Sequence, residues 1–285
     1  MIKIYNRKTK QVIEERENGD NSLKYLYNHR SGRLILKLLI NPIFSRIYGI
    51  YKKTFFSKYA IKKFINKNSI DINKFEVKNY KSFNDFFTRK LKKEYLVKKY
   101  DKNDFISPAE SKLSVYKINK DLRVNIKGSL YTIDELIQDD IDNSYIDGNC
   151  LIFRLSVDNY HRYCHIDDGK LIYTKKIEGK LHTVRSISSN YKIYKENKRV
   201  VSKLKTNNFG ELFYIEVGAL LVGDIINYDS NTFKKGEEKG YFNIGGSTIV
   251  ILTKKNIKID EDIINYTNQN IEVLIEYGEK IGILK

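Results

Sequence analysis

Apolar residues change their spacing near residue 100 of this chain. Before that point they recur at helical spacing among basic residues, which predicts two or three helices between residues 21 and 70. Beyond it, short apolar runs alternate with Gly, Asn and Asp, a pattern typical of short strands. The predicted strands cover residues 113–118, 150–156, 170–177, 180–187, 212–217, 220–226, 247–253 and 271–275. We therefore predict an α+β fold, in which a helical N-terminal region precedes a mainly antiparallel β body.

Local signals add three elements to this pattern. Residues 1–20 are polar with alternating charges, and we expect a short strand or a frayed start there. Ser82 is a plausible N-cap for a helix that runs to about Leu91. Thr132 stands before an apolar and acidic run at residues 133–137, which predicts one short helix inside the β body.

Positive charge is concentrated in the first hundred residues. The net charge of the chain is +17, and residues 1–100 hold 25 Lys/Arg against 8 Asp/Glu, while the remainder is balanced. We therefore divide the chain into a basic helical region, residues 1–100, and a mainly β domain, residues 101–285. A basic segment beside a neutral body indicates attachment to a polyanionic surface, either anionic lipid headgroups or nucleic acid.

The apolar residues of the basic region favour lipid over nucleic acid. Charges interrupt each apolar run before the ~18 residues that a membrane span requires, and Pro42 should break a helix. An amphipathic segment lying in the membrane interface fits this pattern, and so does an ordinary helix that packs on the body. No nucleic-acid-binding motif is recognisable. The polar first 20 residues do not resemble a signal peptide.

A glycine pair directly before a predicted strand is the first candidate for chemistry. Gly245 and Gly246 precede Ser247, and an apolar run follows. A Ser in this position has its hydroxyl beside the carbonyl of Gly246, which is the geometry for an N-to-O acyl shift that cuts the chain. The alternative is a glycine turn that simply leads into a strand.

Histidines and one carboxylate supply candidate proton-transfer groups. His161 follows a predicted strand and adjoins Arg162, so it is a candidate base, or alternatively a hydrogen-bonded structural histidine. Glu110 could orient that imidazole, or could be a solvated acid in a turn. His165 and His182 are weaker candidates.

Other common chemistries have no signature in the sequence. We find no dinucleotide fingerprint, P-loop, HExxH helix or zinc cluster. Cys150 and Cys164 form no CxxC pair and have no metal-ligand spacing. We therefore expect no metal site.

Seven motifs, in order along the chain, give a family resemblance. Together they resemble the phosphatidylserine decarboxylase family, whose members process themselves and use a pyruvoyl group. The motifs lie at residues 83–91 (FNDFFTRKL), 106–111 (ISPAES), 126–132 (IKGSLYT), 159–162 (NYHR), 179–184 (GKLHTV), 216–223 (EVGALLVG) and 236–248 (GEEKGYFNIGGST).

The resemblance implies a specific activity and mechanism. The chain would cleave between Gly246 and Ser247 into a large and a small chain, and Ser247 would become the pyruvoyl cofactor. Glu110 and His161 would activate the Ser247 hydroxyl. The substrate would be phosphatidylserine and the product phosphatidylethanolamine. The implied partner is an anionic membrane surface, with the protein held peripherally on the cytoplasmic face of the cell membrane, and the resemblance leaves room for a homodimer.

Two residues depart from the motifs of this family. Glu110 stands where the family carries Asp, and Asn159 stands where it carries Asp before Tyr-His-Arg, with Asp158 one residue earlier. Both positions are acidic ones linked to self-processing or decarboxylation. The alternative function is therefore a non-processing paralogue that binds lipid and has lost the chemistry.

Overall fold

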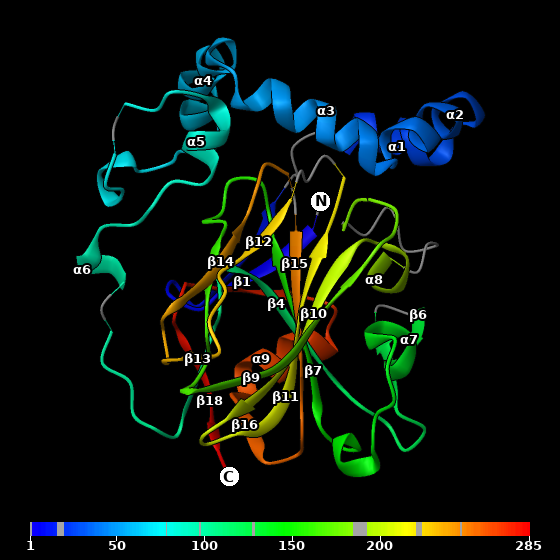
Figure 1. The fold of residues 1–285 in the computed structure, drawn as a ribbon, viewed down its shortest axis with the longest axis vertical. Helices are drawn as coiled ribbons and strands as arrows, with labels where there is room; N and C mark the ends of the chain where they lie inside the picture. Colours follow the sequence, from blue (N-terminus) through cyan, green and yellow to red (C-terminus); the bar gives the residue numbers. More distant parts are fainter. Residues whose placement is uncertain are drawn as a thin grey trace.

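One ten-stranded sheet forms the centre of the protein (Figure 1). The computed structural model describes residues 2–15, 20–77, 79–96, 98–126, 129–184, 193–220, 224–245 and 247–285. In spatial order the strands of this sheet are β13 (Thr232–Phe233), β9 (Gly169–Ile177), β10 (Arg199–Thr206), β11 (Gly210–Gly218), β15 (Ser247–Thr253), β7 (Asn149–Leu155), β4 (Ser111–Lys117), β17 (Glu272–Ile275), β1 (Ile2–Asn6) and β2 (Gln11–Glu15).

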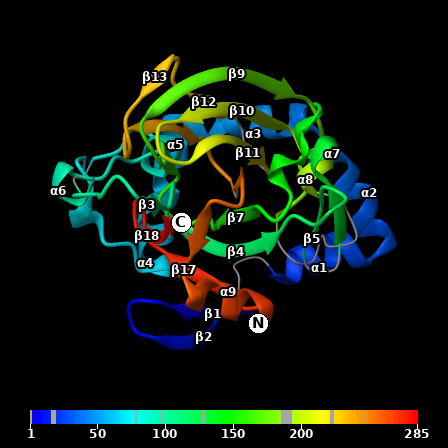
Figure 2. The same cartoon turned by 90° about the horizontal axis from the view of Figure 1, so that it is seen from below.

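The sheet is antiparallel at every step except one, where β1 lies parallel to β17. Figure 2 shows the sheet curving from β13 and β9 at one edge, through β7 and β4, to β1 and β2 at the other. Every residue of β7 and β15 is buried, because these strands are covered on both faces. The mainly antiparallel α+β fold predicted from the sequence is confirmed.

Smaller elements cover the sheet. The first of three small sheets consists of β12 (Ile225–Asn227), β14 (Glu238–Phe242) and β8 (Arg162–Cys164). The second consists of β16 (Ile257–Ile259), β18 (Lys280–Leu284) and β3 (Asp104–Ile106). The third pairs β5 (Arg123–Ile126) with β6 (Ser129–Thr132). The helices of this part are α7 (Ile133–Ile137), η3 (Asn143–Tyr145), α8 (Ile193–Glu196) and α9 (Glu261–Asn268). The longest, α9, packs against β4 and β17. Together with the large sheet these elements form the sheet body.

The remaining helices form a layer across one end of the sheet body (Figure 1). This helical layer consists of α1 (Asp20–Asn28), α2 (Arg30–Leu39), α3 (Pro42–Lys53), η1 (Phe55–Lys58), α4 (Tyr59–Asn68) and α5 (Phe83–Phe87). Two short turns of helix, η2 (Ile72–Lys74) and α6 (Lys93–Leu96), lie along the connection to the body.

A sharp bend separates α2 from α3. Asn41 caps α3 by accepting a hydrogen bond from the backbone N–H of Ile43, and Pro42 occupies the first turn, where its missing N–H costs nothing. Among the described residues, no single helix is long and apolar enough to cross a membrane. The pair α2 and α3 reaches that length and composition only when taken together, across a bend of 69°.

Three contacts fasten the helical layer to the body. The N–H of Leu181 donates to the carbonyl of Ile40 at the end of α2, at 3.0 Å. The Tyr27 hydroxyl accepts from the N–H of Thr183 at 3.0 Å. An apolar cluster joins α5 to the segment before β15, with Phe83 and Phe87 packed on Ile244. The layer is thus attached close to the predicted cleavage segment.

Several predicted elements are confirmed within a few residues of their expected bounds. The strand predicted at 247–253 is β15, and five others correspond to β4, β7, β9, β11 and β17. The helix predicted after Thr132 is α7. Ser82 caps α5 as expected, but the helix ends at Phe87 instead of Leu91, since Arg89 turns inward to bond backbone carbonyls.

Two predicted strands differ from the structure. Residues 180–184 form only an isolated bridge at Lys180, because Leu181 bonds the end of α2, while 185–187 lie outside the described residues. Of the strand predicted at 220–226, β12 begins only at Ile225, and 221–223 lie outside the described residues, as do the motif residues 127–128.

Candidate active site

Ser247 begins β15 in the middle of the large sheet. Its neighbours across the sheet are Gly218 on β11 and Leu155 on β7. The side chain is fully buried, and none of the described residues forms a hydrogen bond with its hydroxyl. Gly245 has a φ of 130°, which favours glycine at this position. Gly246, the other residue of the predicted cleavage, lies outside the described residues.

His161 lies on the loop between β7 and β8, close to the segment that precedes Ser247. Its backbone carbonyl accepts from the N–H of Phe242 at 3.0 Å. Its ring is buried against the ring of Phe87, with centroids 4.1 Å apart. Nδ1 donates to the carbonyl of Asn159 at 2.9 Å, so the neutral ring carries its proton there. Nε2 is left as a buried acceptor without a partner.

The surroundings of His161 keep its ring neutral. Burial lowers the pKa of His161 from 6.5 to about 3, and the Arg89 guanidinium adds to that shift. Its hydrogen bond to Asn159 and its contact with the Gly245 backbone oppose this lowering of the pKa. The contact with Gly245 shows that the ring lies beside the residue two positions before Ser247. No hydrogen bond joins His161 to Ser247 among the described residues, but both reactive atoms lie unpartnered and buried near this segment. An imidazole of this kind can take up a proton only briefly.

Glu110 reaches His161 only through Asn159. The Asn159 side-chain amide donates to Glu110 Oε1 at 2.8 Å, and its own amide oxygen accepts from the N–H of Ser156. No hydrogen bond between Glu110 and His161 occurs in the described part of the chain, so the direct orientation expected from the sequence is corrected to an indirect one. Burial raises the pKa of Glu110, and the bond from Asn159 opposes that rise.

Arg89 is a site residue that the sequence analysis did not single out. It is 3% exposed, and its guanidinium donates to the carbonyls of Asp158 and Asn159 at 3.0 and 3.2 Å. Its charge stacks over the rings of Phe75 and Phe86. A signal was present in the sequence, since Arg89 stands two residues after the aromatic pair Phe86 and Phe87, within the motif at residues 83–91. Arg89 fixes the loop that carries His161.

An apolar pocket of about 370 Å³ opens beside Gly245. Side chains of the helical layer form one side of it, and Leu220, Ile244 and Val157 of the body form the other. Phe87, which packs on His161, also lines it. Its three charged lining residues are Lys52, Lys63 and Lys67. The pocket therefore joins the helical layer to the surroundings of Ser247.

His182 lies away from this pocket and has a structural contact. The Tyr27 hydroxyl accepts from Thr183 and donates to His182 Nδ1 at 3.2 Å, so His182 connects α1 to the body. Burial lowers the pKa of His182. The possible secondary role of His182 predicted from the sequence stays a prediction.

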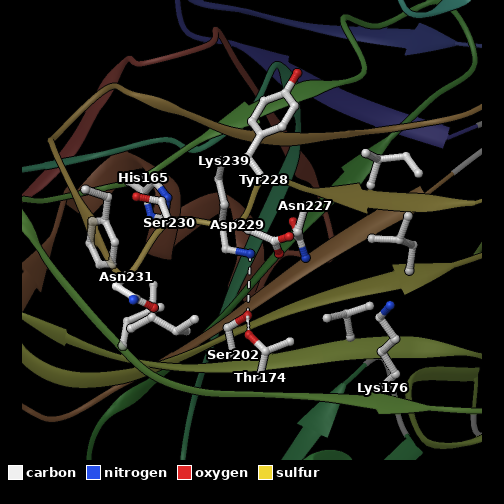
Figure 3. Close-up of a pocket in the computed structure, with 16 residues that line it drawn as sticks. His165, Thr174, Lys176, Ser202, Asn227, Tyr228, Asp229, Ser230, Asn231 and Lys239 are labelled. Carbon is white, nitrogen blue, oxygen red and sulfur yellow. Dashed lines mark hydrogen bonds between the residues drawn. The ribbon is translucent and has the colours of Figure 1, made fainter.

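His165 lines a different cavity, of about 570 Å³, between β9–β10 and the β12–β14 strands (Figure 3). Its ring stacks on Phe233 at 3.8 Å, and burial followed by the Lys239 charge lowers its pKa to about 3. Lys239 lies at the floor, where it pairs with Glu216 and lies 3.4 Å from Ser202 Oγ, the contact dashed in Figure 3. Neither Ser247 nor His161 lines this cavity.

Comparison with known proteins assigns the chain to a family. The sequence model described as phosphatidylserine decarboxylase matches residues 83–283. Phosphatidylserine decarboxylase proenzyme 2 of Clostridium acetobutylicum is 52% identical, over 99% of this chain and 98% of that protein. The proenzyme of Clostridium tetani is 41% identical, over 99% of this chain and 98% of that protein. The proenzyme of Clostridium botulinum strain Hall is 42% identical, over 100% of both chains.

The chain belongs to the phosphatidylserine decarboxylase family. It is therefore a decarboxylase, a type of lyase. The relatives are named as proenzymes, and the buried, unpartnered hydroxyl of Ser247 fits a residue that reacts within its own chain. The residues around it also fit a pyruvoyl group at this position, since an unpartnered imidazole nitrogen and an apolar pocket adjoin the same segment.

The two departures from the family motifs contact each other. Glu110 and Asn159 form the 2.8 Å hydrogen bond described above, in which the longer acid meets a neutral amide. Glu110 and Asn159 therefore form a pair, and the carbonyl of Asn159 accepts the hydrogen bond from His161 Nδ1.

Proposed function

We propose that this chain is a precursor that cuts itself between Gly246 and Ser247 and then converts phosphatidylserine to phosphatidylethanolamine and CO2. The observation that carries the proposal is the Ser247 hydroxyl, buried and unpartnered at the start of β15, with the unpartnered Nε2 of His161 near the same segment. The names of the relatives support both the precursor and the substrate.

Self-cleavage requires one proton to move from oxygen to nitrogen. The Ser247 hydroxyl attacks the carbonyl carbon of Gly246, the peptide bond breaks, and an ester forms. His161 takes the hydroxyl proton and returns it to the Ser247 nitrogen, a transfer suited to a ring that holds a proton poorly. Elimination then removes the proton on Ser247 Cα and releases the Gly246 carboxylate. Water replaces the nitrogen, which leaves as ammonia.

The pyruvoyl group made from Ser247 would supply a carbonyl that withdraws the electrons released with CO2. The residues of the chain prepare its surroundings. Phe87 and Ile244 exclude water from the pocket beside Gly245, which favours loss of a carboxylate as neutral CO2. His161, whose Nε2 has no hydrogen-bond partner among the described residues, would move the proton that the product carbon requires.

Intact mass spectrometry of the purified protein tests self-cleavage. The wild-type chain should yield a small fragment that comprises residues 247–285, and Ser247→Ala should stay at the full 33.6 kDa, because no hydroxyl remains to attack. A wild-type chain that remains whole in detergent and in lipid would refute the proposal and favour a lipid-binding protein without chemistry.

Replacing a histidine tests the assignment of the base. His161→Gln removes the imidazole acceptor and should slow appearance of the small fragment by about 100- to 10,000-fold. The matched control is His165→Gln, because His165 is equally buried but lines the other cavity. Equal slowing by the two substitutions would show a general effect on folding and would contradict the assignment.

The helical layer is proposed to hold the protein on an anionic bilayer. Large apolar side chains on its outer face are exposed, and no Lys or Arg in the described residues 20–96 takes part in an ion pair. The exposed apolar residues are Leu34, Ile35, Leu38, Ile43, Phe44, Ile47, Ile50, Tyr51, Phe55, Phe56 and Tyr59. Apolar insertion combined with basic residues at the headgroups supports peripheral attachment.

Sedimentation with lipid vesicles tests the attachment. Binding to vesicles that contain phosphatidylglycerol should exceed binding to pure phosphatidylcholine, and it should weaken with salt, since exposed charges are screened within about 8 Å at physiological ionic strength. Equal binding to both kinds of vesicle at every salt concentration would rule out an electrostatic contribution to the proposed attachment.

A further inference from the structure

The pocket beside Gly245 carries positive charge and no negative charge. Lys52 comes from α3, and Lys63 and Lys67 come from α4. No Asp or Glu is among its lining residues. Lys63 and Lys67 are four residues apart, so they lie on the same face of the helix. Three lysine side chains thus line one largely apolar cavity.

Lys52 is the inner of these three lysines. Its side chain is half-buried, whereas Lys63 and Lys67 are exposed. Its Nζ lies 4.5 Å from the ring centroid of Phe83 and 5.2 Å from that of Tyr48. Burial lowers the pKa of Lys52. None of the ion pairs among the described residues includes it, so a partly desolvated cation faces the pocket without a carboxylate.

The walls of the pocket require a ligand with an apolar part. Phe64, Phe83 and Leu220 line it alongside the lysines. It opens between α3 and α4, and the outer sides of α3 and η1 carry the exposed apolar residues Ile47, Ile50 and Phe56. A lipid lying against that outer surface can therefore place its headgroup region in the pocket.

We propose that Lys52, with Lys63 and Lys67 at the mouth, binds the phosphodiester of an anionic glycerophospholipid whose headgroup reaches Gly245. The inference rests on the proposed function, since it identifies how the same site recognises its substrate. The lysines suit the phosphodiester better than the carboxylate of the headgroup. An ammonium paired with the carboxylate that leaves as CO2 would stabilise the ground state and slow the reaction.

Isothermal titration calorimetry on the full-length Ser247→Ala chain tests this assignment. The probe is dihexanoyl phosphatidylserine below its micelle concentration, compared with glycerophosphoserine and with inorganic phosphate. We expect the dihexanoyl lipid to bind most tightly. Lys52→Gln should weaken that binding by about 10- to 100-fold, because a desolvated charge-assisted contact is lost. Lys52→Arg should keep most of it.

Neighbouring lysines on the same helices provide matched controls. Lys53 on α3 and Lys62 on α4 do not line the pocket, so Lys53→Gln and Lys62→Gln should change binding by less than about 2-fold, although each removes the same charge. Lys63→Gln with Lys67→Gln should weaken binding by an intermediate amount, because these side chains remain solvated.

Three outcomes would overturn the proposal. Lys52→Gln could bind the dihexanoyl lipid as tightly as the unsubstituted chain. Lys53→Gln could weaken binding as much as Lys52→Gln, which would show unspecific attraction. Inorganic phosphate could bind as tightly as the lipid, which would identify a free-anion site. Because Ser247→Ala cannot process, none of these results depends on self-cleavage, and failure of cleavage in the wild type would leave Lys52-dependent binding intact.

Discussion

Most buried lysine and arginine side chains of the sheet body pair with carboxylates, and Arg199 bonds backbone carbonyls instead, whereas the lysines and arginines of the helical layer have no carboxylate partner among the described residues. In the body, Lys239 pairs with Glu216 at 2.5 Å, Lys112 pairs with Glu15 at 2.8 Å, and Arg154 pairs with Glu272. No such pair involves a Lys or Arg in the described residues 20–96.

Apolar side chains show the same contrast. Those of β7 and β15 are buried, while α2, α3 and η1 carry half of the large apolar residues that are exposed in the described part of the chain. The body therefore pairs most of its buried charges internally. In the helical layer many apolar side chains are exposed and the basic residues have no carboxylate partner among the described residues, which supports the proposed attachment to a bilayer. Four experiments can break or sharpen this comparison, beginning with the largest expected effect.

Removing one partner of a buried ion pair should strongly destabilise the body. Glu216→Gln leaves Lys239, which is 5% exposed, without a countercharge, and we expect a loss of about 3–5 kcal/mol in the free energy of unfolding. Urea denaturation of the uncleavable Ser247→Ala chain measures it. Lys62→Gln in the helical layer should stay within about 0.5 kcal/mol. If Lys62→Gln lowered the free energy of unfolding as much as Glu216→Gln, the stability of the helical layer would also depend on its charges.

Exchanging the acid and the amide tests the matched pair of Glu110 and Asn159. Asn159→Asp places two carboxylates together and should slow self-cleavage about 10- to 100-fold, the equivalent of one charge-assisted hydrogen bond. Adding Glu110→Gln restores an amide-to-carboxylate bond and should return the rate to within a few-fold of the wild type. Intact mass measured over time gives the rates. A double variant as slow as Asn159→Asp would show that the contact does not support His161.

Acid should weaken the body through its buried histidines. His161 has a pKa of about 3 in the folded chain against 6.5 ordinarily, so the unfolded chain binds more protons between these values, and stability falls as the pH drops below 6.5. At pH 5 the loss from His161 should be about 2 kcal/mol.

Urea denaturation of the Ser247→Ala chain at pH 7 and pH 5 measures this loss, and adding His161→Gln should reduce it. Part of the loss of stability that remains after His161→Gln comes from His165, whose pKa is also lowered to about 3. An unchanged difference between the two pH values after His161→Gln would contradict the burial of a neutral ring at this position.

Polar substitutions on the outer face of the helical layer should change vesicle binding and leave folding intact. Ile47 and Ile50 are each 61% exposed, and replacing both with Ser should weaken binding to anionic vesicles about 10-fold in total, about 0.7 kcal/mol for each side chain. The unfolding free energy should change by less than about 0.5 kcal/mol. The control is Ile172→Ser, an exposed position on β9 of the body, which should leave vesicle binding unchanged. Loss of binding there would place the membrane contact on the body as well.

Local sequence predicted the elements whose patterns are complete within a few residues. The run of β-branched and apolar residues after Ser247 predicted β15 with its correct bounds, and Ser82 predicted the start of α5. β10 was not predicted, because Lys and Ser interrupt its apolar residues, and only pairing with β9 and β11 makes it a strand. The helix α9 was missed as well, since its polar residues hide the apolar side that packs on β4.

The sequence by itself determined which residues are available for chemistry and where the charge lies. Ser247, His161 and Glu110 stand in recognisable motifs, and the excess of Lys and Arg in the first hundred residues can be counted directly. Only the tertiary structure decided how they meet. It placed Asn159 between Glu110 and His161, and it closed the pocket with helices nearly two hundred residues before Gly245. The physical reason is that periodicity and capping act over a few neighbouring residues, whereas contacts between distant segments depend on which faces pack together when the whole chain folds.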